Sequence, residues 1–212
     1  MILIKKQSEP HQWTAYRKTA GAAYQSQSYL TDSLLKEQGY ICAYCMRRIP
    51  CKDSLSNEDH HIEHIKPRSE YLKNQLDYKN MVIVCPGHMG DKDHCDRSKG
   101  NKEMTLSPLN SRVIQTISYE NNGFIKSSNS DWNRELNDIL NLNDKVLVNA
   151  RKTTLQEIIT QLNTKKKNRW TKDMLQKYLD KYQEKHSDHG KKKYYPYCGI
   201  VIYYLQKKLT KM

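Results

Sequence analysis

Residues 42–45 read Cys-Ala-Tyr-Cys, and this short stretch decides the fold class that we expect for the chain. Two cysteines separated by two residues can direct both thiolates at one point, which is typical of a metal site on a tight turn. A redox role is the alternative, but the strand–helix–strand pattern of a thioredoxin-like unit does not surround the pair. In a cytosolic chain, closely spaced cysteines are more often metal ligands than disulfides.

A second pair, Cys85 and Cys95, can complete a four-ligand site. Nine residues separate these two cysteines, and the intervening PGHMGDKDH contains two glycines that allow it to loop out. His88 forms a competing C-x2-H arrangement with Cys85, and His94 lies directly before Cys95. The pattern favours a closed site that stabilises folding and does not itself react. The predicted ligands of this structural Zn²⁺ are Cys42, Cys45, Cys85 and Cys95.

Between the two cysteine pairs, residues 57–67 read NEDHHIEHIKP. A short alternating strand would place Glu63 and His64 at adjacent positions that point in opposite directions. An acid beside a histidine is usually structural, but the position of this pair between two cysteine pairs favours a reactive site. By strand parity His60 shares a face with His64, although we expect both His60 and His61 to be solvated.

The rest of the sequence predicts helices with few strands. The apolar run MVIVC at 81–85 predicts a buried strand, and an Asn-Gly dipeptide predicts the turn of a hairpin over 112–127. Apolar residues recur at helical spacing between 131 and 182, and a last helix is expected over 197–208.

The N-terminal segment is expected to hold one helix capped by Ser8 and a second helix that ends at Gly39. The predicted fold class is therefore α+β, a mostly helical chain around a small metal-stapled core. We expect three parts: a helical segment at 1–39, the core with its zinc at 40–111, and a hairpin plus helices at 112–212.

The chain is strongly basic, with a net charge of +13 and a pI near 9.4. Lys and Arg neutralise phosphates and release counterions, so we expect a nucleic-acid partner. Residues 165–193 carry more than half of the net charge, which fits either a solvated helix face or a nucleic-acid surface. No apolar run approaches the ~18 residues of a membrane span, and no secretory signal is visible. We therefore expect a cytoplasmic protein without membrane contact.

Four elements in order resemble the motif of HNH nucleases: CAYC (42–45), IEHIKP (62–67), NMVIVC (80–85) and CDRSKGN (95–101). The resemblance implies a ββα-metal fold, in which two strands and a helix surround one catalytic divalent ion. It also implies an endonuclease that hydrolyses phosphodiester bonds. The expected core is thus a zinc-stapled ββα-metal (HNH) fold.

The same resemblance implies roles for single residues. His64 matches the general base that takes a proton from the attacking water, and Asn80 matches the Asn that braces a loop. Glu63 and Asp96 match the two metal-holding positions, where the family usually has Asp and then His or Asn. Carboxylate oxygens suit Mg²⁺ or Mn²⁺ as the catalytic ion. The residues expected to contact nucleic acid are Lys66, Arg68, Arg97 and Lys99.

A wider resemblance covers most of the chain. LLKEQGYICAYC, EHIKPRS, CDRSKGN, TLSPLN and the helical second half are similar to the PtuB-type HNH proteins of Septu and retron-associated anti-phage systems. This similarity implies an ATPase partner of the PtuA type and, through that complex, a retron RNA–DNA hybrid. The alternative is a zinc-stapled nucleic-acid-binding or scaffold subunit without catalysis, which the unusual residues at 63 and 96 leave open.

Overall fold

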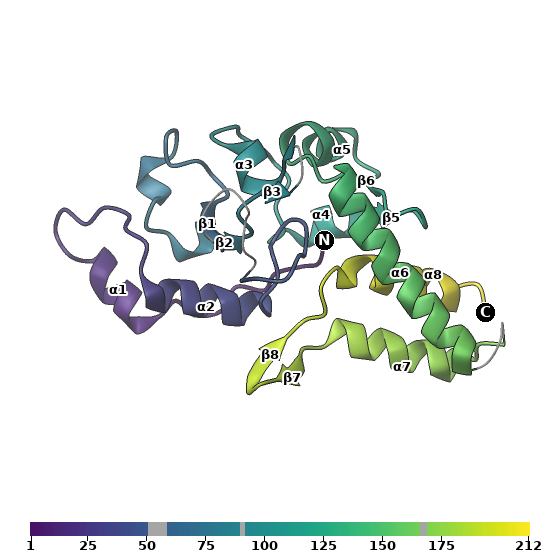
Figure 1. The fold of residues 1–212 in the computed structure, drawn as a ribbon. Coiled ribbons are helices and arrows are strands. Elements are labelled where there is room, and N and C mark those ends of the chain that lie inside the picture. The colour runs from purple at the N-terminus through teal and green to yellow at the C-terminus, as the bar shows by residue number, and fades with distance from the viewer. Residues whose placement is uncertain (51–58, 90–91, 166–168) are drawn as a thin grey trace.

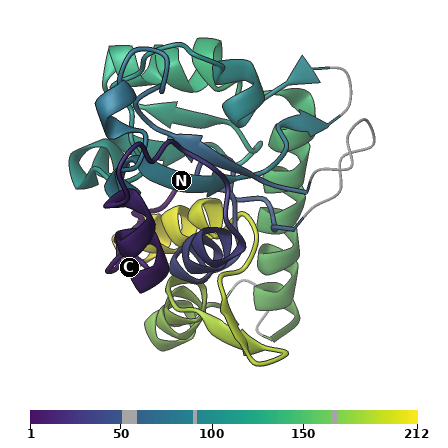
Figure 2. The same cartoon turned by 90° about the vertical axis from the view of Figure 1, so that its left-hand side faces the viewer.

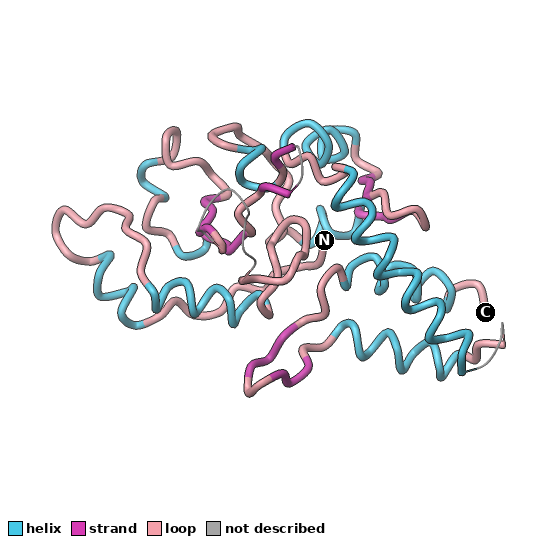
Figure 3. The backbone as a smooth tube through the Cα atoms, in the orientation of Figure 1, coloured by secondary structure: helices cyan, strands magenta, loops and turns pink. Residues whose placement is uncertain are grey.

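The computed structural model describes residues 1–50, 59–89, 92–165 and 169–212. The fold is α+β, as predicted: small two-stranded sheets lie among helices (Figure 1). Short strands and long loops dominate the first half of the chain, whereas longer helices dominate the second half (Figure 3).

The N-terminal segment contains two helices, α1 (His11–Arg17) and α2 (Ser28–Gln38). α1 does not begin at Ser8, as the sequence predicted, but after Pro10. Pro10 is the last residue before the helix: its ring holds φ at −57°, close to the helical value, but its ψ of 139° is extended. The helical backbone therefore starts at His11. α2 ends at Gly39 as predicted, and this glycine has a left-handed φ of 63°.

The central sheet pairs β1 (His61–His64) with β2 (Met81–Val84) in antiparallel register. Glu63 lies opposite Val82, and every residue of β2 is buried, which confirms the predicted strand. The connection contains two 3₁₀ turns, and a hairpin and a helix follow the sheet. These elements are η1 (Leu72–Asn74), η2 (Tyr78–Asn80), β3 (His88–Met89), β4 (Lys92–Asp93) and α3 (Cys95–Lys99).

The outer edge of β2 is covered by the N-terminal segment and not by a third strand. Gln38, at the end of α2, is buried; its side-chain amide accepts from Ile83 N–H (2.7 Å) and donates to Ile83 O (2.8 Å). Ala43 N–H also donates to Ile83 O, and Lys6 Nζ donates to Met81 O. α2 packs against β2 (Figure 2), so the backbone groups of a buried edge are satisfied.

The second half of the chain is mostly helical. Its elements are α4 (Ser111–Thr116), β5 (Ile117–Tyr119), β6 (Ile125–Ser127), α5 (Ser130–Arg134), the π-helical η3 (Glu135–Ile139), α6 (Lys145–Lys165), α7 (Lys172–Gln183), β7 (His186–Asp188), β8 (Lys191–Lys193) and α8 (Cys198–Leu209). The predicted hairpin is present as β5–β6. Its first part is instead helix α4, because the side chain of Asn110 accepts from Arg112 N–H and caps that helix. The hairpin β7–β8 was not predicted.

One continuous cluster of buried apolar residues joins all parts of the chain. Trp13 from α1, Leu34 from α2, Ile83 from β2 and Leu205 from α8 all belong to it. α7 packs along α8, and α6 crosses α8 on another side (Figure 1). Within the described ranges, no helix is both long enough and apolar enough to span a membrane.

Substitution of Gly39 tests how tightly the end of α2 is packed. An alanine there would place Cβ 2.5 Å from Tyr194 Cδ2 and 3.0 Å from Tyr194 N. At Gly21, which also has positive φ, a Cβ would meet nothing within 4 Å. Gly21→Ala should therefore cost about 1 kcal/mol in unfolding free energy. Gly39→Ala should cost at least about 1 kcal/mol more, because it adds overpacking. Equal urea midpoints for the two variants would contradict this.

Candidate active site and metal centre

Four buried cysteines, Cys42, Cys45, Cys85 and Cys95, converge on one point. Their Sγ atoms all lie within 4.8 Å of one another. The Sγ atoms of Cys42 and Cys95 are 3.8 Å apart, and those of Cys45 and Cys85 are 3.7 Å apart. Zinc–sulfur bonds of about 2.3 Å at tetrahedral angles separate the sulfurs by about 3.8 Å. The distances fit a four-coordinate zinc and are much longer than the roughly 2.05 Å of a disulfide.

A tight turn presents the first two thiols. The N–H of Met46 donates to Cys42 O (3.0 Å), and the N–H of Cys42 donates to Arg47 O (2.8 Å). Met46 has a φ of 63°, so the chain reverses directly after Cys45. The turn points both sulfurs of the pair toward the same side, as the spacing predicted.

The long connection between the second two thiols folds into the β3–β4 hairpin. His94 N–H donates to Gly87 O at 2.7 Å, which returns the chain to its starting point. A Cβ on Gly87 would lie 2.5 Å from His94 O and 2.7 Å from Arg97 Cβ, and its φ is 79°. Only glycine fits this close approach.

The two histidines that could compete with the cysteines take other positions. His88 Nδ1 lies 2.8 Å from Asp93 Oδ1, across the β3–β4 pair. His94 is fully buried, and its Nδ1 lies 3.2 Å from Cys95 Sγ. From there the imidazole can donate to a thiolate and hold it in place, a common arrangement around metal ligands.

Without a cation, the cluster favours a single thiolate: burial opposes ionisation of Cys42, but hydrogen bonds from the other three sulfurs outweigh it and lower the pKa of Cys42 well below its ordinary value. Hydrogen bonding to Cys42 raises the pKa of Cys85 well above its ordinary value, and burial together with the neighbouring sulfurs does the same for Cys95. Zinc binds thiolates, so a bound divalent cation supplies the charge that lets these groups ionise together. The donor set therefore fits zinc.

A second group of possible ligands lies where β1 meets α3. Alternation along β1 puts His61 and Glu63 on one face. Asp96, in the first turn of α3, meets them: its Oδ2 lies 3.2 Å from His61 Nδ1, and it shares a hydrogen bond with Glu63. One imidazole nitrogen and carboxylate oxygens suit Mg²⁺ or Mn²⁺. His61 was not among the predicted ligands, although its two-residue spacing from Glu63 could have identified it.

Glu63 is buried among polar partners. Lys99 Nζ lies 2.7 Å from Glu63 Oε1, and Tyr44 OH donates to the same oxygen at 3.2 Å. Burial and the charge of Asp96 raise the pKa of Glu63 to about 8, although Lys99 acts in the opposite direction. Burial acts to raise the pKa of Asp96 as well. Hydrogen bonds with His61 and Glu63 outweigh it, so that pKa is lowered.

The possible ligand atoms of His61, Glu63 and Asp96 lie close together but do not surround a common point. In the part of the chain that the structure describes, the cysteines form the only set of three or more such ligands whose atoms all lie within 4.8 Å. Binding of an ion by His61, Glu63 and Asp96 therefore requires a side-chain movement. If the side chain of Glu63 moves to bind the ion, its contact with Lys99 has to break or lengthen.

His64 is buried and held by the main chain. Its Nε2 lies 2.9 Å from the carbonyl oxygen of Gln75, which can only accept, so Nε2 carries the proton and Nδ1 has the lone pair. Burial lowers the pKa of His64 to about 4, and the bond to Gln75 offsets only part of this effect. At neutral pH the imidazole is uncharged and able to accept a proton.

Asn80 connects the two strands of the central sheet. Its Oδ1 accepts from Lys66 N–H (2.8 Å), and its Nδ2 donates to Lys66 O (3.1 Å) and Asn74 O (3.4 Å). These bonds tie the segment after β1 to the residue before β2. A bracing role for Asn80 is consistent with these bonds and stays a prediction.

The four predicted nucleic-acid contacts differ in exposure. Lys66, Arg68 and Arg97 are exposed. Lys99 is 1% exposed, and its ammonium group bonds Glu63, with His64 O 3.4 Å away. The expectation that Lys99 contacts a phosphate does not match this position, because its charge is directed at the acidic pair inside the protein.

The basic segment at 165–193 forms α7 and the β7–β8 hairpin in its described part. Tyr178 and Tyr182 are buried in the core beside α8, so their spacing reflects helix packing and not base stacking. The lysines, such as Lys177 and Lys192, lie exposed. The segment therefore offers charge without exposed aromatic rings from α7.

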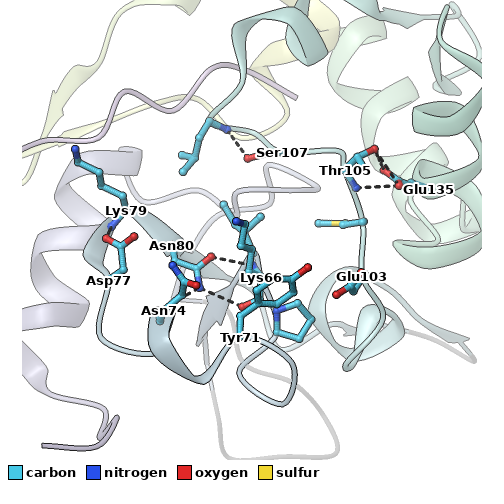
Figure 4. A pocket seen from close by; sticks show the side chains of 14 residues that line it. Lys66, Tyr71, Asn74, Asp77, Lys79, Asn80, Glu103, Thr105, Ser107 and Glu135 are labelled. Atoms are coloured by element: carbon cyan, nitrogen blue, oxygen red, sulfur yellow. Dashed lines mark hydrogen bonds between the residues drawn. The ribbon is translucent and has the colours of Figure 1, made fainter.

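A cavity of about 530 Å³ opens beside the loop that follows His64 (Figure 4). Lys66, Tyr71, Asn74 and Asn80 lie along one side of it, and Glu103 lies opposite. His64, Glu63 and Asp96 are not among its lining residues. The cavity is therefore a neighbour of the reactive groups and does not contain them.

Comparison with known proteins matches this part of the chain. Residues 42–102 match a family model described as HNH endonuclease. No curated protein matches the sequence. The matched range contains the four clustered cysteines, both carboxylates, His64 and Asn80. Residues 42–102 are thus similar to the domain of HNH endonucleases.

Removal of one clustered thiol should remove the zinc. Protein purified with zinc is expected to hold one ion per chain by mass spectrometry of the metal, and Cys42→Ala should lose most of it and unfold at lower temperature. Cys198→Ala is the matched control, because Cys198 is equally buried but lies outside the cluster. A Cys42→Ala protein with full zinc content would refute the ligand assignment.

Binding of Mn²⁺ to the zinc-loaded protein tests the second group of ligands. His61→Ala and Asp96→Ala should each weaken Mn²⁺ binding by at least about 10-fold, measured by electron paramagnetic resonance of the free ion. Asp93→Ala removes an exposed carboxylate three residues from Asp96 and should leave the affinity unchanged. Equal affinity in all three variants would place the ion elsewhere.

Proposed function

We propose that residues 42–102 form the catalytic core of a metal-dependent HNH endonuclease that hydrolyses phosphodiester bonds in nucleic acid. The observation that carries the proposal is the placement, at neighbouring positions of β1, of a neutral His64 with Nδ1 as its lone-pair nitrogen and of Glu63, which shares a hydrogen bond with Asp96 of α3. The family match over the same residues supports it.

In this proposal the cysteine cluster and the carboxylates have separate tasks. Zn²⁺ on the four thiolates is structural, since a closed four-sulfur site has no open position for water. Glu63 and Asp96, with His61 beside them, would hold Mg²⁺ or Mn²⁺, which would supply charge neutralisation for the scissile phosphate and the leaving oxygen.

His64 acts as the general base. Its Nδ1 takes a proton from water as the water oxygen bonds to phosphorus. The bond from phosphorus to the 3′ oxygen breaks, and that oxygen takes up a proton from solvent. The products are a 5′-phosphate and a 3′-hydroxyl. Asn80 keeps the segment after β1 in place during the reaction, because both of its amide atoms bond Lys66.

The exposed basic side chains suit a polyanionic substrate. Lys66, Arg68 and Arg97 are exposed and follow His64 and Asp96 closely in the sequence, and the net charge of +13 favours binding of a phosphate backbone. We therefore propose nucleic acid as the substrate. The charges do not distinguish DNA from RNA, so both polymers belong in the assay.

The wider sequence similarity supports a finer proposal. As in PtuB-type proteins of Septu and retron-associated systems, the chain would be the effector nuclease of a cytoplasmic anti-phage complex with a PtuA-type ATPase, and a retron RNA–DNA hybrid would reach it through that complex. The helices outside residues 42–102 offer the surface for such a partner. Co-purification with a PtuA-type ATPase, and loss of phage protection in His64→Ala, would test this role.

One observation favours the alternative, a nucleic-acid-binding or scaffold subunit without catalysis. Lys99 already neutralises Glu63 at 2.7 Å and could substitute permanently for an ion. In that case the protein would bind nucleic acid in the presence of EDTA and cut nothing. The nuclease assay below separates the two functions.

His64→Ala should lower cleavage of plasmid DNA or RNA by about 10²- to 10⁴-fold in Mg²⁺ or Mn²⁺, because it removes the general base. Zinc content and circular dichroism should remain as in the wild type. His11→Ala is the control, since His11 is an exposed histidine at the start of α1.

EDTA should stop cutting by the wild-type protein while binding persists. The nuclease proposal fails if wild-type protein, alone and with the ATPase, binds both polymers but cleaves neither in either metal.

A further inference from the structure

An aromatic residue from outside the HNH domain touches the proposed base. Tyr24 lies in the loop between α1 and α2, eighteen positions before the domain begins at residue 42. Its ring centroid is 4.6 Å from that of His64, and the two ring planes are nearly perpendicular at 88°. This is a close edge-to-face contact, which restricts rotation of the imidazole.

The loop that contains Tyr24 also binds Gln75, whose main-chain carbonyl fixes the proton on His64. Gln75 O accepts from His64 Nε2 at 2.9 Å, and the side-chain oxygen of Gln75 accepts from Tyr24 N–H at 3.0 Å. The next carbonyl, that of Leu76, accepts from Trp13 Nε1 at 3.0 Å. Tyr24 and Trp13 therefore hold the segment at 75–76 from the outside, while the Tyr24 ring covers the imidazole.

Tyr24 also carries a predicted phosphate ligand. The guanidinium carbon of Arg68 lies 4.6 Å from the centroid of the Tyr24 ring, a cation–π contact. Arg68 is exposed, so its remaining N–H groups face solvent beside His64. Arginine in this setting can donate two parallel hydrogen bonds to a phosphate. One ring thus contacts both the proposed base and an exposed cation.

We propose that Tyr24 is a positioning residue of the nuclease site: its ring holds the imidazole of His64 with Nδ1 toward the attacking water and holds Arg68 where a substrate phosphate binds. The proposal rests on the nuclease function. Its claim that the Tyr24 ring fixes the orientation of the His64 imidazole can be tested without any cleavage of nucleic acid. The ring performs both tasks, and the hydroxyl, which bonds Ser26, is not needed for either.

The chain allows a graded set of variants. Tyr24→Phe keeps the ring and removes only the hydroxyl, whereas Tyr24→Ala and Tyr24→Leu remove both ring contacts. Tyr29→Ala is the matched control, since Tyr29 is a half-buried tyrosine on α2 without a contact to His64 or Arg68 among those recorded for the described residues. Circular dichroism and zinc content identify any variant that fails to fold. If Tyr24→Ala fails to fold, Tyr24→Leu replaces it as the truncation to be measured.

The first measurement is nitrogen-15 NMR of the histidine side chains at neutral pH, with the His64 signals assigned by their loss in His64→Ala. Wild type, Tyr24→Phe and Tyr29→Ala should show His64 in the single tautomer with the proton on Nε2. In Tyr24→Ala and Tyr24→Leu the imidazole loses the ring that restricts its rotation and can turn away from Gln75 O. These two variants should therefore show averaging between the two tautomers. An unchanged single tautomer in both truncations would overturn the positioning role, whether or not the protein cuts nucleic acid.

The second measurement is cleavage in Mn²⁺. Tyr24→Ala and Tyr24→Leu should lower kcat by about 10- to 100-fold, the effect of releasing a neighbour of a reactive group. KM should rise as well, because Arg68 loses its support, and Tyr24→Phe should recover most of the activity. Wild-type rates in both folded truncations would refute the proposal. An inactive wild type would refute the nuclease function instead, while the tautomer result would still decide the geometry.

Discussion

Four buried thiols whose sulfurs all lie within 4.8 Å of one another are the constraint on which the rest of the site depends. They come from a turn before β1, from the end of β2 and from the start of α3, so one cation would join β2 and α3, and β1 with its reactive side chains is held through its pairing with β2. Two strands alone are marginal in water. The sheet of this protein is no larger, and β1 and β2 therefore need the metal on one side and α2 on the other. Zinc would couple folding of the core to the placement of Asp96 directly after Cys95.

The charge of such a centre also explains why an arginine far along the chain, Arg151, can be buried. Four thiolates with one zinc carry a net charge of −2. Arg151, on α6, is 1% exposed, and its partners among the described residues are neutral oxygens, those of Gly123, Leu142 and Asn143. Cys45 and Cys95 are among the groups that favour its charged form, which burial opposes. A buried cation without a carboxylate is costly unless a nearby anion offsets it, and the thiolate cluster is that anion.

Patterns that depend on neighbours in the sequence were predictable. The two cysteine pairs, the strand MVIVC and the Asn-Gly hairpin follow from spacing, apolar β-branched residues and turn chemistry, and each is present. Patterns that depend on contacts between distant segments were not. Lys99 was expected at the surface, as lysines usually are, because nothing local shows that Glu63 and Asp96 surround its ammonium. Residues 111–116 contain β-branched residues that favour a strand, but the Asn110 cap makes them a helix. Tyr24 lies forty residues from His64, and no local pattern connects them.

The same reasoning sets the extent of the structural unit around the site. The matched domain begins at residue 42, yet the outer edge of β2 is satisfied by Gln38 and Lys6, and Lys6 in turn forms a buried ion pair with Glu37 at 2.7 Å. Each edge group left buried without a partner would cost roughly 1–3 kcal/mol. Several such losses approach the whole stability of a small domain. Residues 1–41 therefore belong to the folding unit of the site: they close the sheet that carries His64 and supply the ring that touches it.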